Sequence, residues 1–134
     1  MPNRYLLDTS AILAHYRKES GWETVQGLFE DREADIEIAA PTLTEFARRM
    51  HALGVNDDDI QQTLERYSLL FDKTVAIDGV IALAAYSLGR QSPDRLPLID
   101  ALIAAAASVD KAVLVHRDEH MAVIPPAVVD QLIL

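Results

Sequence analysis

The sequence predicts a single α/β domain across residues 1–134, with a mainly parallel central sheet between two layers of helices, a three-layer α/β/α fold. Short apolar runs of strand length alternate with stretches that have helical periodicity. No Asn-Gly or Asp-Gly turn joins two of the strand-like runs, which favours parallel strands connected through helices. A chain of 134 residues, half of them hydrophobic, is sufficient for one domain with one core.

The expected elements follow one another in a regular order. Strand-like runs occur at residues 5–7, 36–39, 75–77, 112–115 and 131–134, the last after the Pro125-Pro126 break. Helical patterns cover residues 9–16, 22–29, 41–53, 60–71, 80–87 and 98–109. Pro97 is expected at the first position of the last helix, whose alanines suit tight central packing.

Composition excludes several kinds of protein. The chain contains no cysteine, so disulfide bonds, thiolate metal sites and catalytic cysteines are excluded. The longest apolar stretch, residues 101–107, is far shorter than the ~20 residues needed to cross a bilayer. The first residues lack the apolar core and cleavage site of a signal peptide. We therefore expect a soluble, cytoplasmic protein without a membrane partner.

Four acidic residues are expected at one edge of the sheet. Asp8 ends the first strand-like run, and Asp118 follows the fourth. Glu45 lies near the start of the helix at 41–53, and Asp100 opens the helix at 98–109. In a parallel sheet the carboxyl ends of the strands and the amino ends of the following helices share one edge. The four carboxylates are therefore predicted to converge.

Each acid also has a purely structural explanation. Asp8 and Asp118 could cap helices, and Asp100 could interact with the dipole of its own helix. The Thr42-Leu43-Thr44-Glu45 segment has the pattern of a capping box. Asp8 and Asp100, however, stand among apolar residues and are expected to be partly buried. Capping alone explains these two acids less well.

A partly buried acid cluster predicts a bound cation. Two carboxylates ~4 Å apart repel by about 4 kcal/mol at an effective dielectric constant near 20, so such a cluster either protonates or binds a cation. Oxygen ligands favour Mg²⁺ or Mn²⁺, whereas the absence of cysteine and of a paired-histidine motif disfavours zinc. Two such ions would change the formal charge from −9 to −5, which remains unusually acidic for a protein that binds nucleic acid.

Four segments that carry these acids resemble the successive acidic motifs of the PIN domain. They are Leu6-Leu7-Asp8-Thr9-Ser10-Ala11-Ile12-Leu13, Thr42-Leu43-Thr44-Glu45-Phe46, Leu98-Ile99-Asp100-Ala101-Leu102-Ile103-Ala104-Ala105 and Val115-His116-Arg117-Asp118. Their order and spacing match over essentially the whole chain. The sequence is most similar in style to VapC-type toxins of type II toxin-antitoxin systems. It departs from the motif at His116, where threonine or serine is more usual, and Glu119 adds a second acid beside Asp118.

This resemblance implies a metal-dependent endoribonuclease that cleaves structured RNA and is the toxin of a toxin-antitoxin pair. The implied partners are RNA, a cognate antitoxin that covers the active site, and a second copy in a homodimer. Asp8 and Asp100 would be the principal ligands of Mg²⁺ or Mn²⁺. The implied site consists of Asp8, Glu45, Asp100 and Asp118 as metal ligands and catalytic acids, with Thr9 and Ser10 orienting a ligand or a phosphate.

Two other functions stay open. A PIN-like domain could be a catalytically inert binding module, because fold does not fix function, although four retained acids argue against this. A phosphoryl-transfer enzyme could use Asp8 as its nucleophile. Against that reading, Ser10 occupies the place of a second acid, and no lysine ends the fourth strand-like run.

Several further residues have expected places around the site. His116 and His120 are expected to be solvated residues of a surface turn. The apolar residues between 60 and 71 are expected to pack in the core, with any exposed part available as a dimer face. Basic residues that could meet RNA near the acids are Arg48, Arg49 and Arg117, and Arg4 could face the entry. Arg17 and Lys18 could also do so, but they are rather expected on a solvated helix surface or in ion pairs with neighbouring acids.

Overall fold

The computed structural model describes residues 3–134 and confirms the predicted fold class. Its sheet is entirely parallel, with the strand order β3-β2-β1-β4-β5. The strands are β1 (Arg4–Leu7), β2 (Asp35–Ala39), β3 (Lys73–Val75), β4 (Val113–His116) and β5 (Gln131–Ile133). The helices are α1 (Thr9–Arg17), α2 (Trp22–Glu30), α3 (Ala40–Ala52), α4 (Asp57–Ser68), α5 (Gly79–Gln91), α6 (Leu98–Val109) and α7 (Glu119–Ala122).

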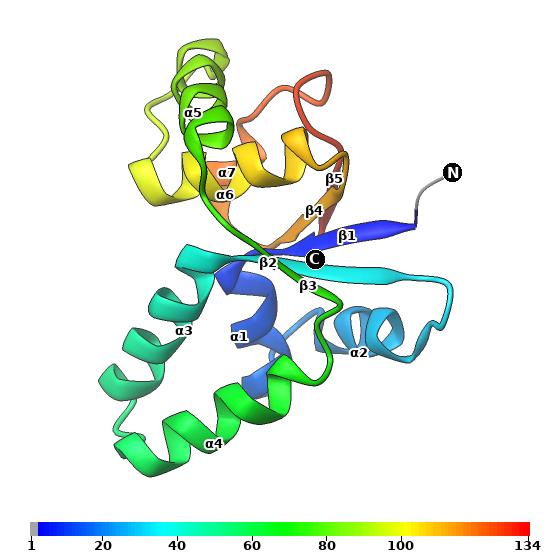
Figure 1. Ribbon diagram of the computed structural model, residues 1–134, viewed down its shortest axis with the longest axis vertical. Helices are drawn as coiled ribbons and strands as arrows, with labels where there is room; N and C mark the ends of the chain where they lie inside the picture. Colours follow the sequence, from blue (N-terminus) through cyan, green and yellow to red (C-terminus); the bar gives the residue numbers. More distant parts are fainter. Residues whose placement is uncertain (1–2) are drawn as a thin grey trace.

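Helices cover both faces of the sheet. Figure 1 shows the sheet between α5, α6 and α7 on one face and α1 to α4 on the other. Alternate residues of β1 belong to different cores, because Leu6 packs with the α5 and α6 side chains whereas Leu7 packs with α1 and α3. The alanines of α6 at positions 104–107 are fully buried, which allows this helix to lie close to its neighbours.

Local interactions define where the helices begin. Asp8, Asn56 and Asp78 are the N-caps of α1, α4 and α5, and each side chain accepts a hydrogen bond from a backbone N–H of the first turn. Helix α6 begins at Leu98, so the prediction that Pro97 is its first residue was wrong by one position. Pro97 instead occupies the N-cap, where its extended backbone introduces the helix.

Two other local predictions were wrong. The third strand was expected at residues 75–77 but spans Lys73–Val75, because its partner β2 ends at Ala39 and offers no further backbone groups. The capping box at Thr42 does not form, because the helix already begins at Ala40 and has Ala39 as its N-cap. Thr42 therefore lies inside the first turn, with its hydroxyl buried.

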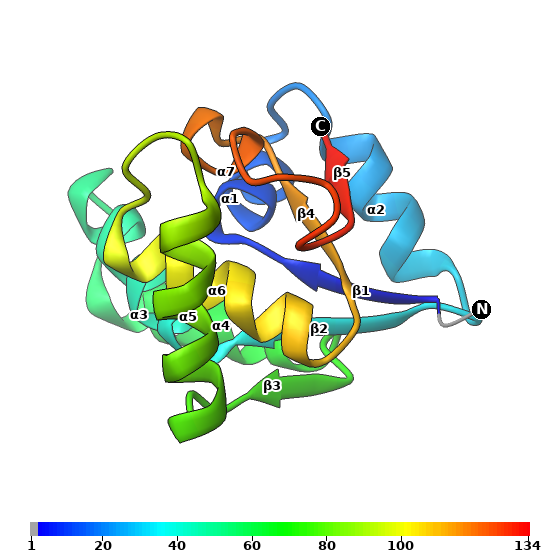
Figure 2. The same ribbon diagram turned by 90° about the horizontal axis from the view of Figure 1, so that it is seen from above.

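The order of the strands brings the acid-bearing segments together. Strand β1 lies between β2 and β4, so α1, α3 and the loop after β4 begin next to one another. Figure 2 shows α6 lying beside α5 and crossing the sheet, where it also contacts β4 and α3. Within residues 3–134, no helix is long and apolar enough to cross a membrane.

Candidate active site

The four predicted acids meet at one small cavity on the carboxyl edge of the sheet. Its volume is about 150 Å³. Two residues of the lining, Leu13 and Arg49, were not among the predicted metal ligands and catalytic residues. The lining consists of Asp8, Thr9, Ser10, Leu13, Glu45, Arg49, Asp100 and Asp118, which includes every residue predicted for the site.

Asp8 lies deepest in the cluster. Its side chain is 2% exposed, and its Oδ2 accepts hydrogen bonds from the Ser10 backbone N–H at 3.0 Å and the Ser10 hydroxyl at 2.6 Å. Burial raises the pKa of Asp8 above its ordinary value, the bonds from Ser10 oppose this rise, and the charge of Asp118 adds to it. Asp8 therefore caps α1 and also contributes to the acid cluster, so the two explanations of this residue are compatible.

Asp100 projects into the cavity from the first turn of α6. Burial, followed by the charges of Asp118, Asp8 and Glu45, raises its pKa to about 7 from an ordinary value of 3.8. The nearby acids thus make the ionised form of Asp100 unfavourable when no cation is bound. The helix dipole acts in the opposite direction, because the amino end of α6 favours a negative charge.

Asp118 joins Asp100 from the loop after β4. It is the N-cap of α7, and its Oδ1 accepts from the His120 backbone N–H at 2.9 Å and lies 3.1 Å from His120 Nδ1. One ligand atom each from Asp100, Asp118 and His120 lie within 4.8 Å of one another. His120 is therefore a further candidate metal ligand, although it was expected from the sequence to be a solvated residue.

Glu45 is held by a hydroxyl from a different helix. It occupies the second turn of α3, further from the helix start than predicted, and its Oε1 accepts a 2.6 Å hydrogen bond from Thr9 Oγ1. Thr9 is buried, and because both residues line the cavity this bond joins α1 to α3 in the cavity wall. The Glu45 side chain consequently lines the cavity and does not cap its own helix.

Ser10 connects two of the acid-bearing segments. Its hydroxyl donates to Asp8 Oδ2 at 2.6 Å and accepts from the Arg117 backbone N–H at 3.0 Å. The start of α1 and the loop after β4 are thereby fixed relative to each other. Ser10 and Thr9 each donate a hydrogen bond to a carboxylate of the cluster, Asp8 and Glu45 respectively.

Fewer basic residues lie around the acid-lined cavity than was expected from the sequence. Arg49 lines the cavity, and Arg48 lies next to it on the exposed side of α3. Arg117 forms an exposed ion pair with Glu19 at 3.6 Å. The expectation that Arg4 faces the entry was wrong, because its guanidinium lies 3.5 Å from Glu37 Oε2 and donates to the Asp110 carbonyl at 2.8 Å.

The two histidines at and after the end of β4, His116 and His120, differ from each other. His120 is exposed, as expected, whereas the prediction of a solvated His116 was wrong because this side chain is fully buried. Both ring nitrogens of His116 have hydrogen-bond partners, Asp118 N at 3.1 Å and Gln131 Oε1 at 2.8 Å. His116 is therefore not positioned as a metal ligand.

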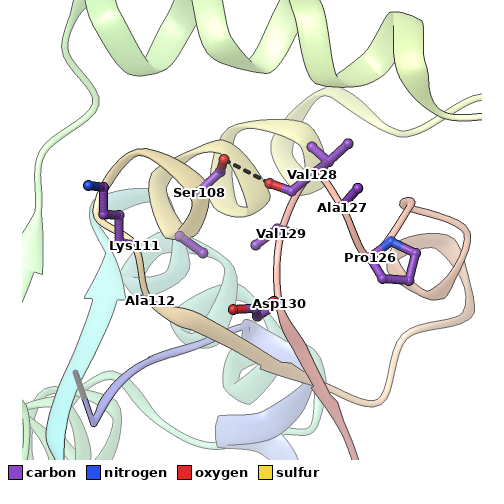
Figure 3. Close-up of a pocket in the computed structure, with 9 residues that line it drawn as sticks. Ser108, Lys111, Ala112, Pro126, Ala127, Val128, Val129 and Asp130 are labelled. Carbon is purple, nitrogen blue, oxygen red and sulfur yellow. Dashed lines mark hydrogen bonds between the residues drawn. The ribbon is translucent and has the colours of Figure 1, made fainter. Parts of the chain in front are cut away.

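A wider hollow lies away from the acids and offers little chemistry. It has a volume of about 330 Å³ and lies between the end of α6 and the segment before β5 (Figure 3). The Ser108 hydroxyl in its wall already donates to the Val128 carbonyl at 3.0 Å. Lys111 and Asp130 are its charged lining residues, and they belong to segments that precede β4 and β5. The smaller acid-lined cavity is the stronger candidate for a site.

Comparison with known proteins supports the fold. The family model of the PIN domain matches residues 5–125. This chain belongs to the PIN domain family. A search of curated proteins gave no match.

Several solved structures share the fold across almost the whole chain. The VapBC2 structure from Rickettsia felis, bound to a promoter DNA fragment, has a TM-score of 0.72 at 17% identity, over 96% of this chain and 98% of that chain. VapBC-5 from Mycobacterium tuberculosis, of the VapBC family of toxin-antitoxin systems, has a TM-score of 0.68 at 21% identity, over 99% and 100%. VapBC-1 from nontypeable Haemophilus influenzae has a TM-score of 0.73 at 16% identity, over 97% of each chain. At these identities the likeness concerns the PIN fold alone.

Proposed function

We propose that this protein is a metal-dependent endoribonuclease that cleaves structured RNA and is the VapC-type toxin of a toxin-antitoxin pair. The observation that carries the proposal is the convergence of Asp8, Glu45, Asp100 and Asp118, from four separate segments, around one cavity. The whole described chain would act as a single PIN domain. Its fold likeness to proteins of VapBC toxin-antitoxin systems supports the toxin role.

The donor set fits a hard divalent cation. Four carboxylates line the cavity, and among residues 3–134 no lysine or arginine forms an ion pair with Asp8 or Asp100. The pKa values of Asp8 and Asp100 are raised chiefly by burial and further by the charges of neighbouring acids, so a bound cation would favour their ionised forms. Mg²⁺ or Mn²⁺ would be held by Asp8, Asp100 and Asp118, with Glu45 completing the site directly or through water.

The cation and the protein side chains would divide the chemistry between them. When bound, the cation supplies positive charge for the scissile phosphate and makes a nearby water more acidic. Thr9 orients the Glu45 carboxylate, so Glu45 can accept the proton of the attacking water. Ser10 holds Asp8 in place, and the Arg49 guanidinium at the cavity can contact a phosphate of the RNA.

The negative net charge of the protein argues against RNA recognition through general attraction to the phosphate backbone. With a formal charge of −9, the protein lacks the general attraction to phosphates that lysine and arginine would provide. Recognition of a particular RNA shape is therefore the expected mode. A cytoplasmic location is part of the same proposal, since RNA and a toxin-antitoxin partner would both be met there.

A homodimer and a cognate antitoxin are the proposed protein partners. In the stretch 60–71, where the exposed part was expected as a dimer face, Ile60 and Tyr67 are buried whereas Leu69 and Leu70 are 86% and 42% exposed. A broader apolar face lies on α5, where three side chains on one helix, Val80, Leu83 and Tyr86, are 65%, 72% and 65% exposed. We propose this α5 face as the dimer contact and the acid cavity as the surface covered by the antitoxin.

The alternative functions have less support in the geometry. A nucleophilic Asp8 is less favoured because its Oδ2 already accepts two hydrogen bonds from Ser10. A covalent aspartyl-phosphate on Asp8 would establish phosphoryl transfer and overturn the nuclease proposal. An inert binding module would have no need for four carboxylates around one cavity.

Cleavage of RNA by the purified protein, free of any antitoxin, tests the proposal. A mixed pool of structured RNAs is incubated with Mg²⁺ or Mn²⁺, with Asp100→Asn and a chelator as controls. We expect cleavage by the wild-type protein that both controls abolish. Cleavage that continues in the presence of the chelator, or in Asp100→Asn, would contradict a metal nuclease with Asp100 in its site.

A further inference from the structure

A buried histidine joins the acid-bearing loop to the last strand of the sheet. His116 is the final residue of β4 and is 0% exposed. Its Nδ1 lies 3.1 Å from the backbone nitrogen of Asp118, and its Nε2 lies 2.8 Å from Gln131 Oε1 at the start of β5. Gln131 Nε2 in turn donates to the Ile124 carbonyl at 2.9 Å. The Asp118 backbone N–H, the His116 ring, the Gln131 side-chain amide and the Ile124 carbonyl thus form one continuous chain of hydrogen bonds.

Backbone groups at the two ends fix the direction of every bond in this chain. The Ile124 carbonyl can only accept, so Gln131 must present its NH₂ group there and its Oε1 to His116. That oxygen can only accept, so His116 Nε2 must carry a proton. The Asp118 backbone N–H can only donate, so His116 Nδ1 must offer a lone pair. The imidazole is therefore neutral and protonated on Nε2 alone.

We infer that His116 is a positioning residue that, as a neutral imidazole protonated on Nε2, fixes the backbone of Asp118 relative to β5. Its contribution to catalysis rests on the proposed nuclease function, whereas its tautomer and its effect on the loop do not. His116 touches neither the cavity nor its lining carboxylates through its ring. It acts through Asp118, which lines the cavity.

The bond to Asp118 complements the bond made by Ser10. The backbone N–H groups of Arg117 and Asp118 are consecutive, and they donate to Ser10 Oγ and His116 Nδ1 respectively. Ser10 also donates to Asp8 Oδ2, so the same loop is fixed to a deep carboxylate on one side and to β5 on the other. These two directed hydrogen bonds to consecutive backbone groups therefore help to hold Asp118 in place relative to Asp8.

The wild-type tautomer can be measured without metal, RNA or mutation. Long-range ¹H–¹⁵N NMR spectra of the histidine rings distinguish the two neutral tautomers and the charged imidazolium. At pH 7 we expect His116 to show the pattern of a neutral ring protonated on Nε2. A ring protonated on Nδ1, or on both nitrogens, would overturn the inference because neither form can accept from the Asp118 N–H.

Two matched substitutions separate the positioning role from a general role in packing. Asparagine at this position offers an acceptor near Nδ1 but does not reach Gln131, whereas glutamine reaches Gln131 but offers no acceptor near Nδ1. We expect His116→Gln to speed hydrogen exchange of the Asp118 amide and to weaken Mn²⁺ binding by about 10- to 100-fold, as for other residues that orient metal ligands. His116→Asn should retain amide protection and most of the Mn²⁺ affinity, even if its Tm is lower.

Equal effects of both variants on the Asp118 amide, or effects that follow only the fall in Tm, would overturn the positioning role. Failure of the wild-type protein to bind Mn²⁺ or to cleave RNA would instead contradict the proposed function. In that case the tautomer and the exchange rate of the Asp118 amide still decide the role of His116.

Discussion

Replacing Asp100 by asparagine should stabilise the protein when no divalent cation is present. The pKa of Asp100 is about 7, against an ordinary value of 3.8, because of burial and the charges of Asp118, Asp8 and Glu45. The folded protein therefore retains a proton that the unfolded chain releases between pH 3.8 and about 7. Wild-type stability should fall as pH rises through this window, and Asp100→Asn should not show that fall.

The size of the gain follows from the shift. A rise of about 3 in pKa corresponds to about 4 kcal/mol of unfolding free energy. Because Asp100 is partly exposed, solvent screening reduces this to about 1–2 kcal/mol. Loss of the favourable interaction with the α6 dipole removes a further few tenths of a kcal/mol. A net gain of about 1 kcal/mol should raise the Tm by about 3–5 °C in a chain of this size.

Thermal unfolding with a chelator, at pH values from 4 to 8.5, measures this effect. Asp58→Asn is a matched control, because it removes the same charge from the exposed first turn of α4. The Tm difference between Asp100→Asn and wild type should grow with pH up to about 7 and then level off. Saturating Mg²⁺ should reverse its sign, since only the wild-type cluster gains from binding. A variant less stable than wild type at pH 8 in the chelator would refute the reasoning.

Three further predictions concern other parts of the chain. The pKa of Glu37 is about 8, raised by burial and by Asp110, so stability should fall as pH rises from 4.5 to about 8, and Glu37→Gln should flatten that part of the urea-denaturation profile. Gln can still donate a hydrogen bond to Asp110, as a protonated Glu37 does. Thr9→Val removes the hydroxyl bonded to Glu45 and should lower RNA cleavage about tenfold, with little change in Tm. Phe46→Ala should lower the free energy of unfolding by about 3–5 kcal/mol, measured in urea, because the side chain is 1% exposed.

Each of these predictions has a distinct contrary result. An unchanged pH profile in Glu37→Gln would mean that Glu37 is ionised throughout the folded state at neutral pH. Full cleavage by Thr9→Val would show that the Glu45 carboxylate needs no hydroxyl to orient it. A loss below 1 kcal/mol in Phe46→Ala would indicate that the surrounding core collapses into the space.

The fold and the convergence of the acids were predictable because both depend on periodic patterns. Alternating strand and helix patterns give a parallel sheet, and a parallel sheet brings Asp8 and Asp118 to the same edge. Asp100 and Glu45 were predicted for the same reason, since they lie near the starts of helices at that edge. The placement of the four acids near one edge therefore follows from topology, whereas the choice of Thr9 and Ser10 came from the resemblance to the PIN domain.

Contacts between distant side chains were not predictable in the same way. Thr42 matched a capping motif, but the N-cap of α3 is Ala39, three residues earlier, and Glu45 accepts a hydrogen bond from Thr9 of another helix. His116 looked like a residue of a surface turn, yet β5 covers it and supplies Gln131 as its partner. Such pairings join residues far apart in sequence, and no local pattern encodes them.

Mn²⁺ titration followed by electron paramagnetic resonance tests most directly whether the four acids form one cation site. Wild-type protein at pH 7.5 is compared with Asp100→Asn and with Asp58→Asn, which carries the same change in charge outside the cavity. We predict that the wild-type protein and Asp58→Asn bind Mn²⁺ equally, and that Asp100→Asn binds at least about tenfold more weakly. Absence of Mn²⁺ binding by the wild-type protein, or equal affinity in all three, would contradict a metal site built from these carboxylates.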